Sequence, residues 1–152
     1  ELYNLYKATG NKTIMPHTAP SSLKVAGKTI TFTAEQKADF QRTIGQTSSD
    51  ILAEIFKSDE YSKLTNVEKI EAVSKVYVFS DNKAKSELKY DYETVTAMEG
   101  GEDVLSREKY DKLTEKAIQI IVNEYFLSKE QRRCNGDPEK LAKLFISKAK
   151  NK

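Results

Sequence analysis

Apolar residues recur every three or four positions through most of the chain, and this spacing restricts the fold more than any other feature of the sequence. Such spacing is typical of amphipathic helices, each of which must bury one face. The longest stripe contains Ile70, Val73, Tyr77, Ala84 and Leu88. We predict helices near 34–44, 48–57, 66–90, 106–128 and 138–149, with a turn or short helix between the second and the third.

Residues that cap helices stand at several of the predicted starts. Thr33 and Thr65 are each followed three positions later by Gln or Glu, which is the pattern of a capping box. Ser106 can cap the segment that follows it, and Asp137 precedes a proline that suits the first turn of a helix. These residues support the predicted boundaries independently of the apolar spacing.

The first residues predict a helix end followed by a loop. Leu5 and Tyr6 lie on one helical face of residues 1–8, and Gly10 is typical of the position where a helix stops. Residues 11–21 contain Pro16 and Pro20, which favour an irregular connection. The chain begins at Glu1 rather than at a methionine, so we expect an excised domain or a processed product.

Residues 22–33 alternate apolar and polar side chains, which predicts a small β-hairpin. A type II′ turn with Gly27 and Lys28 at its centre would pair Val25 with Ile30. An isolated hairpin is marginally stable, so we expect this one to pack against helices.

Gly45 begins the short polar run Gly-Gln-Thr-Ser-Ser between two helical patterns. One interpretation is a turn at which one helix ends and a second is capped by Thr47 or Ser48. The other is a single helix with a kink.

The sequence therefore predicts a mostly α fold, a bundle of about five helices with one small N-terminal β-hairpin. Gly100 and Gly101, flanked by acidic residues, form the clearest internal boundary. We predict a helical module at 1–98 that contains the hairpin, and a C-terminal helical pair at 99–152. The alternative is that the pair packs on the first part as one domain.

Charge and hydropathy limit the classes of partner. Lys and Arg number 25 against 23 Asp and Glu, a net charge of +2 that does not by itself predict binding to nucleic acid or membrane. Residues 129–152 are an exception, with eight basic and three acidic side chains. We see neither a signal peptide nor an apolar run of about 20 residues that could span a bilayer. We expect that the protein is not secreted by a signal of its own.

The residues that usually perform catalysis or bind metals are scarce. His17 is the single histidine and Cys134 the single cysteine, which is too few for a standard zinc site. Phosphate-binding glycine motifs and nucleophile motifs are absent from the sequence. We interpret His17 as an exposed loop residue rather than a general base. Arg132 and Arg133 could favour a thiolate at Cys134, but without a nearby histidine we do not expect a catalytic cysteine. We predict no enzyme activity and no cofactor.

Four residues are candidates for contact with a partner. Tyr90 and Tyr92 lie among mixed charges at a predicted helix end, and tyrosine is enriched at interface hot spots. Arg132 and Arg133 are the most closely spaced cations of the basic C-terminal stretch.

A set of motifs in fixed order carries a resemblance to a known class of protein. The motifs are LYKATG, a proline-containing loop, a short hairpin around a glycine, TAEQ, FQRTIGQT, LTNVEK and VSKVY. Over about residues 2–85 this order resembles a module of large multidomain proteins of phages and prophages of Gram-positive bacteria. The resemblance implies a virion-associated, tail-region or large polyvalent protein, located in a phage virion or the host cytoplasm. It carries no catalytic residues to this chain. Residues 90–152 depart from the pattern.

We therefore expect a non-enzymatic structural or assembly module that docks on a phage protein or on the remainder of a larger chain. Two alternatives stay open. One is a small phage protein that binds and inhibits a host defence protein. The other is a nucleic-acid-binding module that uses the basic C-terminal stretch.

Overall fold

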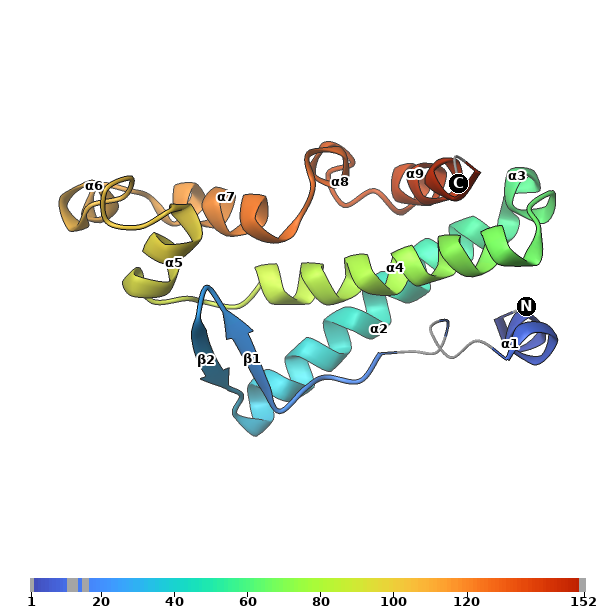
Figure 1. Cartoon of the computed structure of the whole chain (residues 1–152), viewed down its shortest axis with the longest axis horizontal. Coiled ribbons are helices and arrows are strands. Elements are labelled where there is room, and N and C mark those ends of the chain that lie inside the picture. Colours follow the sequence, from blue (N-terminus) through green and yellow to red (C-terminus); the bar gives the residue numbers. More distant parts are fainter. Residues whose placement is uncertain (1, 11–13, 15–16, 151–152) are drawn as a thin grey trace.

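The computed structural model describes residues 2–10, 14 and 17–150, and helices dominate this part of the chain (Figure 1). Parts of the predicted loop at 11–21 and of the basic stretch at 129–152 fall outside the described residues. The helices are α1 (Leu2–Thr9), α2 (Ala34–Lys57), α3 (Asp59–Ser62), α4 (Asn66–Ser86), α5 (Tyr92–Glu99), α6 (Arg107–Asp111), α7 (Glu115–Phe126), α8 (Lys129–Arg133) and α9 (Pro138–Lys150). The strands β1 (Ser22–Val25) and β2 (Lys28–Thr31) form one antiparallel hairpin. The predicted mostly α fold with an N-terminal hairpin is confirmed.

The main core lies between α2, α4 and α9. Ile55, Val73 and Val76 are fully buried there, and Leu141 and Phe145 of α9 reach the same cluster. The Phe145 ring packs on the Phe79 ring with centroids 5.8 Å apart, which joins α9 to α4. Burying a side chain of this size contributes about 1.5–3 kcal/mol, so these three helices form the rigid frame of the molecule.

The chain reverses direction after α4 and runs back beside it. Figure 1 shows α7, α8 and α9 following one another along α4, with α5 and α6 at the far end of the molecule from both labelled termini. A smaller cluster of Val95, Leu105 and Val122 holds α5, α7 and the intervening loop together. Another cluster, of Ala19, Phe40, Ile44 and Ala84, lies toward the hairpin end of α2.

α2 is one continuous helix of 24 residues, so the turn predicted at Gly45 is wrong and the single-helix alternative is correct. Gly45 keeps a helical backbone, since it is not among the residues with positive φ. The Ser48 hydroxyl donates a hydrogen bond of 2.7 Å to the Ile44 carbonyl, an ordinary length for a hydroxyl donor. This polar side chain is satisfied by the turn that precedes it and does not cap a new helix.

Two other predicted helices have different bounds. The helix expected over 66–90 ends at Ser86, and the single helix expected over 106–128 is divided into α6 and α7. The division follows from Thr114, whose side chain accepts a hydrogen bond from the Ala117 amide and starts α7. Helices α5 and α8 were not predicted. Asp91 caps α5, and Ser128 and Gln131 form a capping box on α8.

The hairpin forms with a different register from the one predicted. Leu23 pairs with Ile30 and Val25 with Lys28, so Ala26 and Gly27 occupy the centre of the turn. Both residues have positive φ, as in a type I′ turn, whose twist matches that of the strands. Lys28 forms ion pairs with Asp91 and Glu93, which bind the turn to the start of α5.

The boundary predicted near residue 99 stays a prediction, but the contacts across it are extensive. α9 packs on both α2 and α4, and α7 packs on α4. The Gln119 side-chain amide also donates to the Ser86 carbonyl at 2.6 Å, capping the last turn of α4. Residues on both sides of the boundary thus share one main core.

Candidate functional site

Tyr90 lies in the packing between α4 and α7, with only part of its side chain exposed. Its hydroxyl donates to the Lys85 carbonyl at 2.6 Å, and its ring stacks on Phe126 with centroids 6.0 Å apart. Burial, and to a lesser extent Tyr125, raises the pKa of this phenol far above its usual range. The position favours a packing role over the partner contact predicted for Tyr90.

Tyr92 lies in a different environment at the start of α5. Its ring meets Tyr110 edge-to-face at 5.0 Å, and the Arg107 guanidinium lies over it at 4.6 Å. Arg107 also pairs with Asp111. Tyr92 is thus half-buried in a small surface cluster at the α5–α6 end, apart from the packing of Tyr90.

Arg132 and Arg133 are adjacent on α8 but differ in their contacts. The Arg132 guanidinium donates to the Leu127 carbonyl at 2.6 Å, which fastens α8 to the end of α7. Arg133 is exposed. The structure therefore does not bring the four predicted contact residues into one site: Tyr90 and Tyr92 lie around α5, and the arginines lie on α8.

His17 is half-buried, so its interpretation as an exposed loop residue is wrong. Its Nδ1 contacts the Asp81 carboxylate, and its ring lies 5.2 Å from the Tyr77 ring. Asp81 is 64 positions away in the chain, and no local pattern connects the two residues. The contact ties the segment before the hairpin to α4.

Cys134 is buried at the end of α8, and its thiol points to the Glu130 carbonyl at 3.4 Å. Burial raises the pKa of this thiol, with a smaller opposing effect of Lys140. The raised pKa disfavours the thiolate at Cys134 that the sequence left open, and it agrees with the interpretation that this cysteine is not catalytic.

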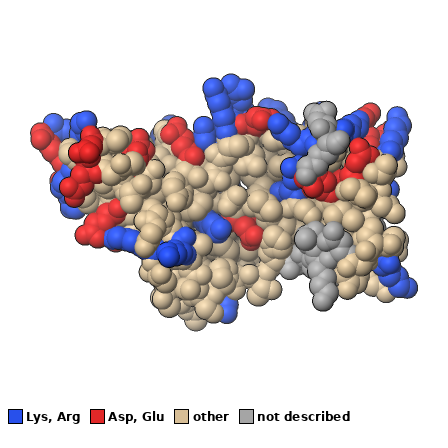
Figure 2. Space-filling model, viewed as in Figure 1, with Lys and Arg blue, Asp and Glu red and all other residues tan. Residues whose placement is uncertain are grey.

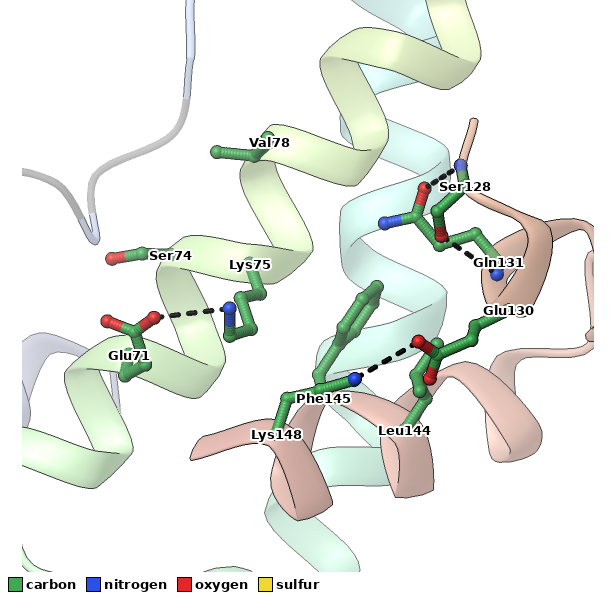
Figure 3. A pocket seen from close by; sticks show the side chains of 10 residues that line it. All are labelled: Glu71, Ser74, Lys75, Val78, Ser128, Glu130, Gln131, Leu144, Phe145 and Lys148. Atoms are coloured by element: carbon green, nitrogen blue, oxygen red, sulfur yellow. Dashed lines mark hydrogen bonds and ion pairs between the residues drawn. The ribbon is translucent and has the colours of Figure 1, made fainter. Parts of the chain in front are cut away.

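A groove of about 480 Å³ between α4, α8 and α9 is the best candidate for a binding site (Figure 3). Val78, Leu144 and Phe145 provide its apolar surface, and Figure 3 shows Phe145 rising from α9 into the space between α4 and α8. Val78 is 54% exposed, although it follows the buried Tyr77. The other lining residues are Glu71, Ser74, Lys75, Ser128, Glu130, Gln131 and Lys148.

The charged groups of the groove are already paired. On α4, Lys75 lies 3.2 Å from Glu71, and Lys148 of α9 lies 3.0 Å from Glu130 of α8. The four charged residues that line the groove therefore sum to no net charge. Half-exposed ion pairs of this kind contribute at most about 1 kcal/mol each, so they orient the walls more than they stabilise them.

The polar side chains from α8 are also engaged. Ser128 and Gln131 form the capping box of α8, in which each side chain bonds the backbone amide of the other at 3.1–3.2 Å. What the groove offers a ligand is mainly apolar contact from Val78 and Leu144, because Phe145 is 2% exposed and lies at the base of the groove. This arrangement suits an inserted apolar side chain better than proton transfer or anion binding.

The sequence did contain a signal for this groove. Val78 lies outside the apolar stripe predicted for residues 66–90 and directly follows Tyr77. An apolar residue off the core face is compatible with a contact surface, but single exposed apolar residues are common, so this signal is weak.

Surface charges are mixed on the face shown in Figure 2, where basic and acidic side chains alternate along the upper edge and the lower central surface is largely uncharged. Three lysines of α9 pair with carboxylates: Lys143 with Glu139, Lys148 with Glu130, and Lys150 with Glu60.

In the part of the chain that is described, no group of three His, Cys, Asp or Glu side chains is placed to hold a metal ion. The helices of residues 2–10 and 17–150 include none that combines the length and the apolar character needed to cross a membrane.

Comparison with known proteins returns no match: no family model, no curated protein and no solved structure is significantly similar to this chain.

Proposed function

We propose that this chain is a non-enzymatic docking module of a phage or prophage protein, acting by protein–protein contact within a virion or tail-associated assembly. The phage context rests on the resemblance over residues 2–85, and the docking role rests on the groove between α4, α8 and α9. A location in the virion or the host cytoplasm follows from this proposal.

The observation that carries the docking role is the exposure of Val78 beside an apolar groove. Val78 is 54% exposed, whereas its neighbours Tyr77 and Phe79 are 2% and 3% exposed. α4 and α9, which bear two sides of the groove, pack on each other in the main core, and the Arg132 side chain fastens α8 to the Leu127 carbonyl at the end of α7. The groove is therefore formed without a ligand. A preformed groove loses little conformational entropy when a partner binds.

The charge of the groove defines the kind of partner. Because Lys75 is paired with Glu71 and Lys148 with Glu130, a charged partner segment would have to displace an existing ion pair. An uncharged segment with one large apolar side chain gains contact with Val78 and Leu144 and displaces no ion pair. We propose such a segment of a neighbouring chain of the particle as the occupant.

Two variants test the groove. Leu144→Arg places a charge on its surface, and Val67→Asp is a control on α4, since Val67 is 77% exposed and does not line the groove. A photo-crosslinking amino acid at position 78 should form one defined adduct with a particle protein in assembled particles. The adduct should be lost when the groove is blocked by Leu144→Arg and kept in the Val67→Asp background.

The phage context has a separate test. Particles purified from the phage or induced prophage that encodes the chain are analysed by mass spectrometry for peptides of the parent protein. Their absence from particles would contradict the assembly role. If position 78 then crosslinks to a host protein at a stoichiometric ratio, the inhibitor alternative replaces it.

Nucleic-acid binding through residues 129–152 is a weaker candidate, because three of its lysines are paired with carboxylates. Phosphate contacts by such a stretch should give an affinity that falls steeply with salt, with a slope of about −0.9 per contact on duplex DNA. The absence of measurable binding at low salt would exclude it.

A further inference from the structure

The segment His17–Ala19, which we call the strap, is held on the body of the protein in the way a bound peptide is held. The Gln41 side chain of α2 contacts its main chain at two points. Its Oε1 accepts from the Ala19 amide at 2.6 Å, and its Nε2 donates to the His17 carbonyl at 3.0 Å. One amide thus binds the donor of one residue and the acceptor of another, as a neighbouring β-strand would.

Side chains add selectivity to this main-chain contact. His17 contacts the Asp81 carboxylate and lies against the Tyr77 ring, and Ala19 is 4% exposed in the cluster of Phe40 and Ala84. Every one of these partners lies on α2 or α4, at least 21 positions beyond Ala19. The contacts of the strap therefore depend on its own main chain and side chains, and they do not require that strap and body belong to the same chain.

The connection between strap and body is short and exposed. The Ser21 carbonyl accepts from the Phe32 amide at 3.0 Å, so the hairpin is already formed at Ser21, and the exposed Pro20 alone separates it from Ala19. Proline restricts the residue before it to extended backbone. Ala19 of a strap that leaves its site would consequently stay extended, so this residue loses less entropy on rebinding than a residue without a following proline.

We propose that the strap is exchangeable: the site on α2 and α4 that holds His17–Ala19 accepts the same segment of a second copy of the chain. The exchanged dimer keeps each hydrogen bond and apolar contact of the strap, with residues 2–10 and Ile14 following the strap to the second copy. Exchange of an identical element carries a low cost in contacts, so the dimer population is set by protein concentration.

Crosslinking of mixed single variants tests the exchange in the full chain. His17→Cys and Asp81→Cys are prepared separately, both with Cys134→Ala, and then mixed and treated with a short bismaleimide. We expect a covalent dimer whose yield rises with total protein concentration. The matched control is the pair Lys28→Cys and Glu93→Cys, which samples the contact between the hairpin turn and α5 within one body.

Each result decides the proposal. A double variant that carries both His17→Cys and Asp81→Cys in one chain reports the contact within a chain. If this double variant is bridged internally, while the mixed single variants give no more dimer than the control pair, the strap does not exchange. If the double variant is bridged neither within a chain nor between chains, the strap contact itself is absent and the proposal is also overturned. Circular dichroism of each variant verifies that the compared chains are folded.

Discussion

Replacing Gly45 by alanine should stabilise the protein, because Gly45 lies in the interior of a long helix for which glycine is poorly suited. Glycine is less favourable than alanine there by about 0.8–1.0 kcal/mol, chiefly because it has more conformational freedom to lose on folding. Gly45 is exposed, its φ is not positive, and an added Cβ would have no neighbouring atom within 4 Å outside the local helix backbone. Neither strain nor a clash should offset the gain.

We therefore expect Gly45→Ala to raise the free energy of unfolding by about 1 kcal/mol and the melting temperature by about 2–4 °C. Gly136→Ala is the matched control. Its added Cβ also has nothing within 4 Å, but Gly136 has a φ of +74°. Alanine in that left-handed conformation costs about 1–2 kcal/mol, so this variant should be destabilised.

Urea unfolding followed by circular dichroism, together with thermal melts, measures both variants against the parent chain. The two substitutions are the same chemically and differ in backbone conformation, so their effects should have opposite sign. If Gly45→Ala were neutral or destabilising while Gly136→Ala behaved as expected, α2 would be interrupted at Gly45 and our account of it would be refuted.

Three further predictions follow from individual side chains. Tyr90→Phe should lower the free energy of unfolding by about 1 kcal/mol, because the hydrogen bond to the Lys85 carbonyl is lost. In the parent chain, the raised pKa of Tyr90 keeps the phenol protonated in the folded state, so stability falls above about pH 10 as the phenol of the unfolded chain ionises. Urea melts of the variant should show a weaker fall over the same pH range. Cys134 should react with a thiol reagent at least about tenfold more slowly than in urea, since burial and a raised pKa protect it; equal rates would contradict its burial. Asp91→Ala should lower the free energy of unfolding by about 1 kcal/mol near neutral pH and by less in acid. The hydrogen bonds from Thr94 lower the pKa of the Asp91 carboxyl, so its stabilising contribution is lost as the pH falls through that pKa. A difference between the melts of variant and parent that does not change with pH would argue against the cap.

The long helices could be predicted from sequence because their signals are local. The Thr33 and Thr65 capping boxes form as expected, and the stripe residues Val73, Tyr77 and Ala84 are buried. Helix α5 was missed because it is short, with a cap at Asp91 but little apolar period. The turn at Gly45 was predicted from the low helix propensity of glycine. The packing of the surrounding helix overrides this propensity.

The candidate sites were harder to predict because they depend on contacts between distant segments. The pairing of His17 with Asp81 and the amide contacts of Gln41 leave no trace in residue spacing. Tyr90 and Tyr92 are two positions apart and look equivalent in sequence. The break at Thr114 and the return of α7 along α4 place the Tyr90 ring against Phe126, whereas Tyr92 meets Arg107.

The position of α9 has a consequence for how the chain folds during synthesis. α9 covers α2 and α4 in the main core, although it follows α2 by about 80 residues in sequence. Until residues 138–150 leave the ribosome, the apolar faces that Leu141 and Phe145 cover stay open to solvent and to other nascent chains. Contacts of such long sequence separation slow folding. We expect cooperative folding only after release of these residues, with the unfinished chain most prone to aggregation just before α9 emerges.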